Sequence, residues 1–132
     1  MSVGAVRTIE GSYPSRPPRA SVRHRASVIR QAIEPAVAAV FEVHIEDLRS
    51  PTRGSPTTAF ARQVAMYLAH VVCGRSLTEI GILFARDRTT VAHACGIVED
   101  RRDDPELDWQ LEHLEQAVAS LIDALSIRKG RR

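Results

Sequence analysis

The chain has 132 residues, of which 44% are hydrophobic and 26% are charged, a composition that can bury the core of one soluble domain with tails. Aromatic residues make up only 5%, which argues against a surface that stacks the exposed bases of single-stranded nucleic acid. The apolar runs are too short to cross a bilayer and the N-terminus lacks the pattern of a secretion signal, so we expect a cytoplasmic protein with no membrane partner.

The net charge of +2 is unevenly distributed along the chain. Residues 1–30 carry six Arg and one Glu, residues 31–95 carry six cations and six acids, and residues 96–125 carry two Arg and nine acids. The last seven residues add four cations. Basic ends of this kind suit a polyanionic partner, although many Arg-rich tails are only solvated.

The two ends of the chain differ from its middle. Residues 1–25 are rich in Gly, Pro, Ser and Arg without an apolar period, which predicts a flexible basic arm. Apolar residues at helical spacing then begin a helical domain, which we place at residues 26–125, before a basic tail at residues 126–132. Within this domain, Pro35 either begins a helix after Glu34 or kinks a longer one.

A link and a loop follow this first helical stretch. Residues 43–48 predict a short extended link with a single turn, and residues 49–56, with two Pro and one Gly, predict a loop. The next helix starts after the loop, where Thr57 or Thr58 can cap it, and is expected to end at Gly74.

A long last helix is expected to end near Leu125, because apolar residues recur along it in alternating steps of four and three. The recurring positions are Leu107, Leu111, Leu114, Val118, Leu121 and Leu125. This stripe packs on the protein's own core or forms a dimer seam. Trp109 beside it is expected to be packed. The expected fold class is all-α, with five or six helices.

Residues 76–99 predict two short helices joined by a sharp break. Ser76 and Glu79 form a capping box at the start of the first helix, and the Asp87 carboxylate is expected to cap the second. Gly81 has no side chain and lets two helices approach closely. These features predict a helix-turn-helix. Each helix carries one apolar stripe at i, i+3, i+4, i+7: Leu77, Ile80, Gly81 and Phe84, then Val91, Ala94, Cys95 and Val98.

The exposed side of the second helix indicates its partner. Its residues are Arg88, Thr89, Ala92, His93 and Gly96, with Thr90 at the margin. They are short or basic, and none is acidic. A helix with such a face fits the major groove of duplex DNA, where Arg can pair with guanine and Thr can donate a hydrogen bond or contact the thymine methyl. The alternative is an ordinary helical hairpin with a solvated face.

Three segments, "ARQVAMYLAH", "SLTEIG" and "RDRTTVAHAC", resemble in this order the C-terminal DNA-binding domain of the bacterial replication initiator DnaA. The resemblance extends upstream through "VAAVFEVHIEDLRS" and covers about Ile33 to Val98. It implies the helix-turn-helix fold of that domain, which is of the Trp-repressor-like type, and binding to double-stranded DNA. It also implies regulation of replication initiation or of transcription, and a place at the nucleoid.

The resemblance also implies roles for individual residues. Arg53 in the loop is the counterpart of an Arg that enters the minor groove, and Arg62 and Gln63 correspond to phosphate contacts. The family's base-contacting Arg-Asp-His-Thr-Thr motif stands here at residues 86–90. The implied DNA-binding set is Arg53, Arg62, Gln63, Ser76, Thr78, Arg86, Asp87, Arg88, Thr89, Thr90 and His93.

Three departures from the family pattern bear on the target site. Arg88 replaces the motif's His and should favour guanine at its position. The turn "LFARD" is one residue shorter than the family's common form, which bears on the angle at which the second helix enters the DNA groove. The loop has only Arg49 and Arg53 in place of a denser basic cluster, so the N-terminal arm is a candidate substitute for minor-groove contact.

Other chemistries lack a sequence basis. No G-x-x-x-x-G-K-[ST] loop occurs, and the only Lys is Lys129, so we expect a stand-alone DNA-binding domain that binds no nucleotide and no cofactor. We expect no catalytic residue and no enzyme activity, because neither Ser76 nor Thr90 has an evident base partner. We expect no bound metal, because the four candidate zinc ligands lack the spacing of a zinc site: His70, Cys73, His93 and Cys95. Both cysteines are expected to be reduced thiols in the core.

The leading hypothesis from the sequence is therefore a sequence-specific binder of double-stranded DNA. The alternative is a protein-interaction module that uses the apolar stripe of residues 107–125 to dimerise or to dock a partner without DNA. A homodimer is possible under either hypothesis.

Overall fold

The computed structural model of the protein describes residues 19–50 and 54–130, with the side chains of residues 26–50 and 54–126. This part of the chain forms six α-helices and no strand, which confirms the all-α prediction. They are α2 (Arg19–Phe41), α3 (Ile45–Arg49), α4 (Pro56–Val71), α5 (Leu77–Phe84), α6 (Arg88–Arg101) and α7 (Pro105–Gly130). None of these helices is long and apolar enough to span a membrane.

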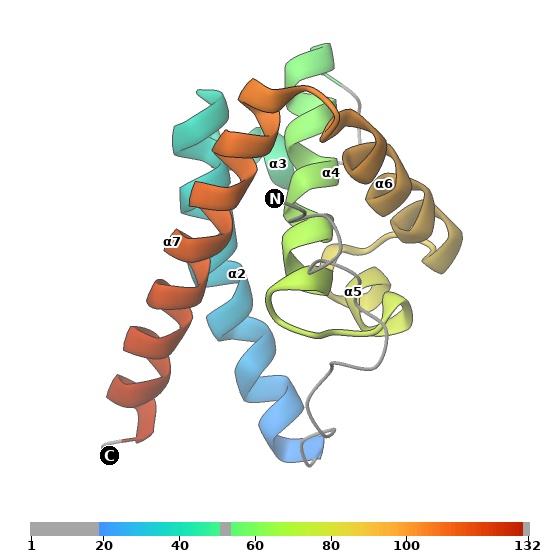
Figure 1. Cartoon of the computed structure of the whole chain (residues 1–132). Coiled ribbons are helices and arrows are strands. Elements are labelled where there is room, and N and C mark those ends of the chain that lie inside the picture. The colour runs from blue at the N-terminus through green and yellow to red at the C-terminus, as the bar shows by residue number, and fades with distance from the viewer. Residues whose placement is uncertain (1–18, 51–53, 131–132) are drawn as a thin grey trace.

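Helix α4 stands at the centre of the fold, with α2 and α7 on one side and α5 and α6 on the other (Figure 1). It contacts α2, α3, α5 and α6, while α7 packs on α2. The core is one cluster to which all six helices contribute, although α3 gives only Leu48 and α5 only Ile80, with partly buried side chains of α5 packed against it. Its largest fully buried members are Tyr67, Ile33, Leu68, Ile80, Leu111, Val37, Val64, Val91, Val98 and Val118. Burial of these apolar side chains provides the main driving force for the arrangement.

The helical region is longer than the sequence predicted at both ends. Helix α2 begins at Arg19, so residues 19–25, expected in the arm, are helical, and α7 continues past Leu125 to Gly130. Backbone hydrogen bonds can extend a helix beyond the point where its apolar stripe stops, which is why the pattern placed both boundaries wrongly. The rest of the expected arm and tail, residues 1–18 and 131–132, lies outside the described residues.

Pro35 lies inside the continuous helix α2, which agrees with the alternative of one longer helix and excludes a helix start at this residue. The start of α4, in contrast, differs from the prediction. The cap of α4 is Ser55, not Thr57 or Thr58: the Ser55 Oγ accepts a hydrogen bond from the Thr58 backbone N–H at 3.1 Å. Pro56 occupies the first helical position, where a missing N–H is tolerated, and this moves the cap upstream.

The leucine stripe of α7 packs within the chain. Leu107, Leu111, Leu114 and Val118 are buried, so this part of the stripe belongs to the protein's own core and cannot serve as a dimer seam. Leu121, in contrast, is 41% exposed.

Trp109 was expected to be packed, and this is wrong, because its side chain is 60% exposed. It lies two residues from both Leu107 and Leu111, which places it about 200° around the helix from each of them. The tryptophan therefore points away from the core.

A buried cation joins the end of α6 to α7. Arg102 lies 2.6 Å from Asp108 Oδ1 and 2.6 Å from Glu115 Oε2, and it donates to the Tyr67 hydroxyl at 2.9 Å. Burial acts to lower the pKa of Arg102, but the hydrogen bonds to Glu115 and Asp108 outweigh it and raise the pKa overall. Tyr67 in turn donates to Glu99 at 2.9 Å, and burial raises the pKa of Tyr67 well above its usual value.

Replacing Arg102 with Met should destabilise the protein. The change leaves two carboxylates without their cation, and because both are partly exposed we expect a loss of about 1–3 kcal/mol in the free energy of unfolding. Urea unfolding followed by circular dichroism measures it. Arg88→Met makes the same chemical change at an exposed position and should stay within about 0.5 kcal/mol of the wild type. Equal midpoints for the two variants would contradict a structural role for the Arg102 cluster.

Candidate nucleic-acid interface

The first helix of the helix-turn-helix starts as the sequence predicted. The Ser76 Oγ accepts from the Glu79 backbone N–H at 3.1 Å, and the Glu79 carboxylate accepts from the Ser76 N–H at 3.0 Å. This reciprocal capping box fixes the start of α5. Thr78, in its first turn, is exposed, as is Ser76.

The turn between the two helices closes tightly around Gly81. A Cβ at this position would lie 2.6 Å from the Arg86 carbonyl oxygen, and the Arg86 N–H donates to the Gly81 carbonyl at 2.8 Å. The sequence predicted a close approach of two helices at Gly81. In the structure, the close approach at Gly81 is to the backbone of the turn. Ala85 adopts the left-handed conformation, with φ of 56°, which costs a non-glycine residue about 1–2 kcal/mol and must be repaid by the surrounding contacts.

Asp87 occupies the N-cap position of α6, but its carboxylate makes no capping hydrogen bond within the described residues. The predicted side-chain cap is therefore wrong. The backbone conformation is that of a cap, with φ of −67° and ψ of 151°, while the side chain is exposed. Its two acceptor oxygens consequently remain open to a partner at the start of the helix.

The outward face of α6 agrees with the sequence prediction. Val91, Ala94 and Val98 are buried, and Cys95 is half-buried. The exposed residues are Arg88, Thr89, Thr90, Ala92, His93 and Gly96. The structure thus brings four predicted DNA-binding residues onto one side of one helix, next to Asp87. Small residues at 92 and 96 keep this side narrow.

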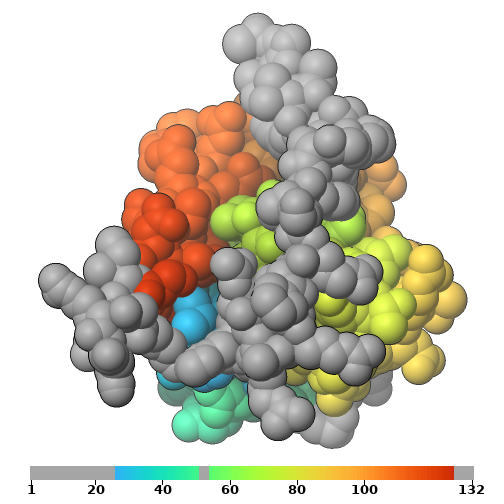
Figure 2. Space-filling model, turned by 90° about the horizontal axis from the view of Figure 1, so that it is seen from below, coloured from blue at the N-terminus to red at the C-terminus, as the bar shows by residue number. Residues whose placement is uncertain are grey.

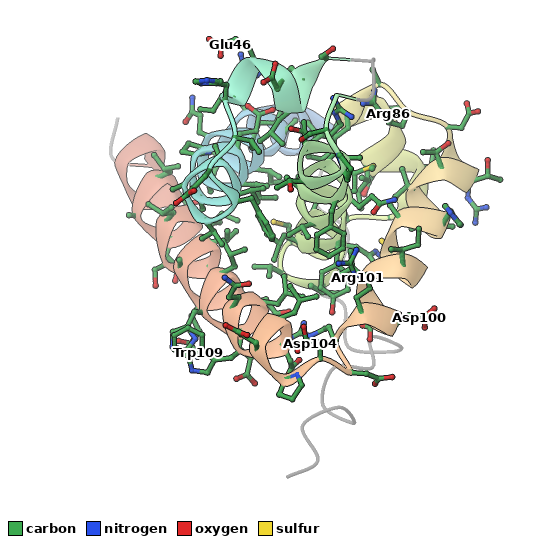
Figure 3. All side chains as sticks on the ribbon, turned by 90° about the horizontal axis from the view of Figure 1, so that it is seen from above. Glu46, Arg86, Asp100, Arg101, Asp104 and Trp109 are labelled. Carbon is green, nitrogen blue, oxygen red and sulfur yellow. The ribbon has the colours of Figure 1, made fainter. Side chains whose placement is uncertain are left out.

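Arg86 and Arg62 lie together beside the end of α3. The Arg86 guanidinium donates to the Ser50 carbonyl at 3.3 Å, and Arg62 donates to the Asp47 carbonyl at 3.0 and 3.2 Å. Burial, followed by the nearby charge of Arg86, lowers the pKa of Arg62. Figure 3 shows Arg86 close to α3. Two cations held by carbonyl groups favour a further anionic partner.

The sequence did not reveal a buried carboxylate next to these cations. Glu34 is only 3% exposed. It pairs with Arg30 at 2.8 Å and with Arg49 at 2.8 Å, and its hydrogen bond raises the pKa of Arg49. Arg30 also donates to the Leu83 carbonyl at 3.2 Å, which ties α2 to α5. These Arg residues, with Arg62 and Arg86, line a cavity of about 190 Å³.

The remaining predicted residues are less informative. Gln63 is half-buried on α4 beside Arg62, and Arg53 lies outside the described residues.

Within the described part of the chain, no group of three or more His, Cys, Asp or Glu is placed to hold a metal ion. Both cysteines are thiols, and burial raises the pKa of Cys95 to about 11.

A family model described as "Bacterial dnaA protein helix-turn-helix" matches residues 30–98, more than half of the chain. The chain belongs to this family. The DnaA 1 initiator of Protochlamydia amoebophila is 40% identical over 77 residues, which cover 58% of this chain and 17% of that protein. The DnaA of Herminiimonas arsenicoxydans is 41% identical over 100 residues, covering 74% of this chain and 21% of that protein. The chain thus spans about a fifth of the length of these DnaA relatives.

Two solved structures contain the same fold over about a third of their own chains. A crystal structure of a DNA replication initiation factor superposes with a TM-score of 0.69 at 35% identity and covers 78% of this chain and 32% of that one. A replication initiator DnaA bound to AMPPCP and single-stranded DNA gives a TM-score of 0.67 at 34% identity, covering 78% and 31%. Both likenesses confirm the DnaA C-terminal fold predicted from the three sequence motifs.

Two glycine-to-alanine substitutions should have opposite effects on stability. Gly81→Ala forces its Cβ against the Arg86 carbonyl and should destabilise the protein by about 1–3 kcal/mol. Gly96→Ala adds a methyl group with no described atom within 4 Å, and in a helix interior it should stabilise by about 0.5–1 kcal/mol. Thermal and urea unfolding of both variants measure the difference. A Gly81→Ala protein as stable as the wild type would show that the turn can move aside.

Proposed function

We propose that the protein binds double-stranded DNA sequence-specifically through α6 and acts as a regulator of replication initiation or of transcription. The observation that carries this proposal is the outward face of α6, where Arg88, Thr89, Thr90 and His93 are exposed together beside the uncapped carboxylate of Asp87. The family membership supports the proposal. The proposed activity is binding alone, without catalysis.

The side chains at the start of α6 have complementary hydrogen-bonding abilities. Arg88 can donate two parallel hydrogen bonds to the O6 and N7 of guanine, and Asp87 can accept from the N4 amino group of cytosine. Thr89 and Thr90 offer a hydroxyl and a methyl group, which suit a base edge or a thymine methyl. Because Arg88 stands where the family motif has His, we expect guanine at the position that it contacts.

Phosphate contacts would hold α6 in register. We assign them to Arg62, Gln63 and Arg86, together with Ser76 and Thr78 at the start of α5. Arg62 and Arg86 line the same cavity and concentrate positive charge there. The N-terminus of α6 adds the positive end of its helix dipole. Arg53, which follows α3 by four residues, is proposed to enter the minor groove.

The regulatory role follows from what the chain shares with its relatives. It matches the helix-turn-helix part of replication initiators and covers about a fifth of their length. A protein that binds sites related to those of an initiator would compete with it for these sites or control a nearby promoter. Selecting bound duplexes from a random pool identifies the site, and specific binding should exceed non-specific binding by at least about 10³-fold.

Arg88→Ala should weaken binding by about 1–3 kcal/mol at one base position and leave the preferences at other positions intact. Arg88→His restores the family residue and should relax the preference for guanine at that position. Binding to the selected duplex and to its single-base variants measures both effects. An equal loss on every sequence would make Arg88 a phosphate contact instead.

Arg62→Ala serves as the comparison, because a phosphate contact carries no sequence preference. It should weaken binding about uniformly across duplexes and reduce the slope of log affinity against log salt by about one. Circular dichroism of the free variant checks that the loss of the hydrogen bonds to Asp47 has not unfolded it.

A further inference from the structure

The outer face of α7, opposite its buried leucine stripe, has no partner within the described residues. Trp109 is 60% exposed on this face, and Figure 3 shows it pointing away from the helical bundle. His113 stacks on it with ring centroids 4.1 Å apart, which leaves much of the indole in solvent. An aromatic side chain of this size is a strong anchor when a partner buries it.

The middle of this face carries few charges and lies between two oppositely charged ends. Positions 109, 113, 116, 117, 120 and 124 carry no Asp, Glu, Lys or Arg, and exposed Asp123 borders them. Ala117, Ser120 and Ala124 are exposed. Exposed acids stand at the start of the helix, at Asp104 and Glu106. At the other end, the last turn of the helix contains Arg128 and Lys129.

A second copy of the chain fits this face. Two α7 helices packed antiparallel place the acidic start of each against the basic end of the other, whereas parallel packing would set acid against acid. We propose that two copies of the protein associate through the outer faces of their α7 helices, antiparallel and with two-fold symmetry. When the contact centres near Ala117, Trp109 lies opposite Ala124 of the second copy, whose small side chain leaves room for the indole.

This association determines where the two α6 helices point. Helices α6 and α7 lie on opposite sides of α4 in the views of Figures 1 and 3, and their colours stand on opposite sides of the molecule in Figure 2. A pair joined at α7 therefore carries its two recognition helices facing away from each other. Such a pair holds two separate duplex segments rather than adjacent half-sites of one duplex. The bridging of duplexes rests on the proposed function, whereas the association does not.

The mass of the protein without DNA tests the association. Sedimentation or light scattering should give twice the chain mass of 14.6 kDa at high concentration, and Trp109→Glu should return it to the monomer. Ile82→Glu makes the same change at an apolar side chain that is 78% exposed in α5, and it should leave the dimer intact. A wild type that stays monomeric at every concentration, or a Trp109→Glu protein that remains dimeric, overturns the proposal.

Cysteine cross-linking tests the antiparallel arrangement. In a background with Cys73 and Cys95 changed to Ala, Ala117→Cys lies near the two-fold axis and should form a disulfide-linked dimer on mild oxidation. Ala124→Cys is the matched control on the same face: its symmetry mate lies about 20 Å away, at about 1.5 Å per residue, so it should not cross-link. Efficient cross-linking at both positions would indicate parallel packing and overturn the arrangement.

A capture assay tests the bridging. An immobilised duplex carrying the selected site should retain a second labelled duplex in the presence of the wild type but not of Trp109→Glu, which should still bind one duplex. If the dimer forms and binds one duplex without retaining a second, bridging is wrong and the association stands. If the dimer forms but binds no duplex, the proposed function fails independently.

Discussion

The close approach between Gly81 and the Arg86 carbonyl fixes the angle at which α6 leaves α5. No Cβ fits there, since it would lie 2.6 Å from that oxygen, and the Arg86 N–H is bonded to the Gly81 carbonyl on the same side. The Arg86 side chain is held as well, because its guanidinium donates to the Ser50 carbonyl at the end of α3. Only Asp87 separates this held residue from the first residue of α6. The direction of α6 is therefore set by backbone contacts that no side chain of α6 has to supply.

The far end of α6 is held by a different kind of interaction. Arg102 follows the helix and bonds two carboxylates of α7, Asp108 and Glu115, together with the hydroxyl of Tyr67 in α4. A buried arginine surrounded by acceptors tolerates little displacement, because any shift would leave a desolvated charge without its partners. With both ends held, the exposed face of α6 is largely preorganised, and less conformational entropy is lost when it binds.

The local features of the site could be predicted from the sequence, and the tertiary ones could not. The capping box at Ser76 and the exposed face of α6 follow from spacing within one helix, and both are confirmed. The predicted side-chain cap at Asp87 is wrong, although the residue type and position are those of a cap. Nothing in the sequence fixes the side-chain rotamer. The pairing of Glu34 with Arg49 joins residues 15 apart through the meeting of α2 and α3, and no helical period reports such a contact. The prediction that Trp109 is packed is wrong because it gave more weight to the residue type than to the angle around α7 that separates Trp109 from the leucine stripe.

The separation of charge across the fold has a physical consequence for orientation. The side with α6 carries exposed Arg88 and half-buried Arg62 and Arg86, while the acids of residues 99–115 lie between the end of α6 and the first half of α7. A polyanion attracts the first side and repels the second, so long-range electrostatics would turn α6 toward a duplex before contact. The same repulsion keeps the start of α7, where Asp104 and Glu106 are exposed, away from the phosphates, and α7 lies on the side of the fold opposite α6. A surface that the nucleic acid disfavours stays available to a protein partner while α6 is occupied, so the two faces can work together without competing for the same ligand.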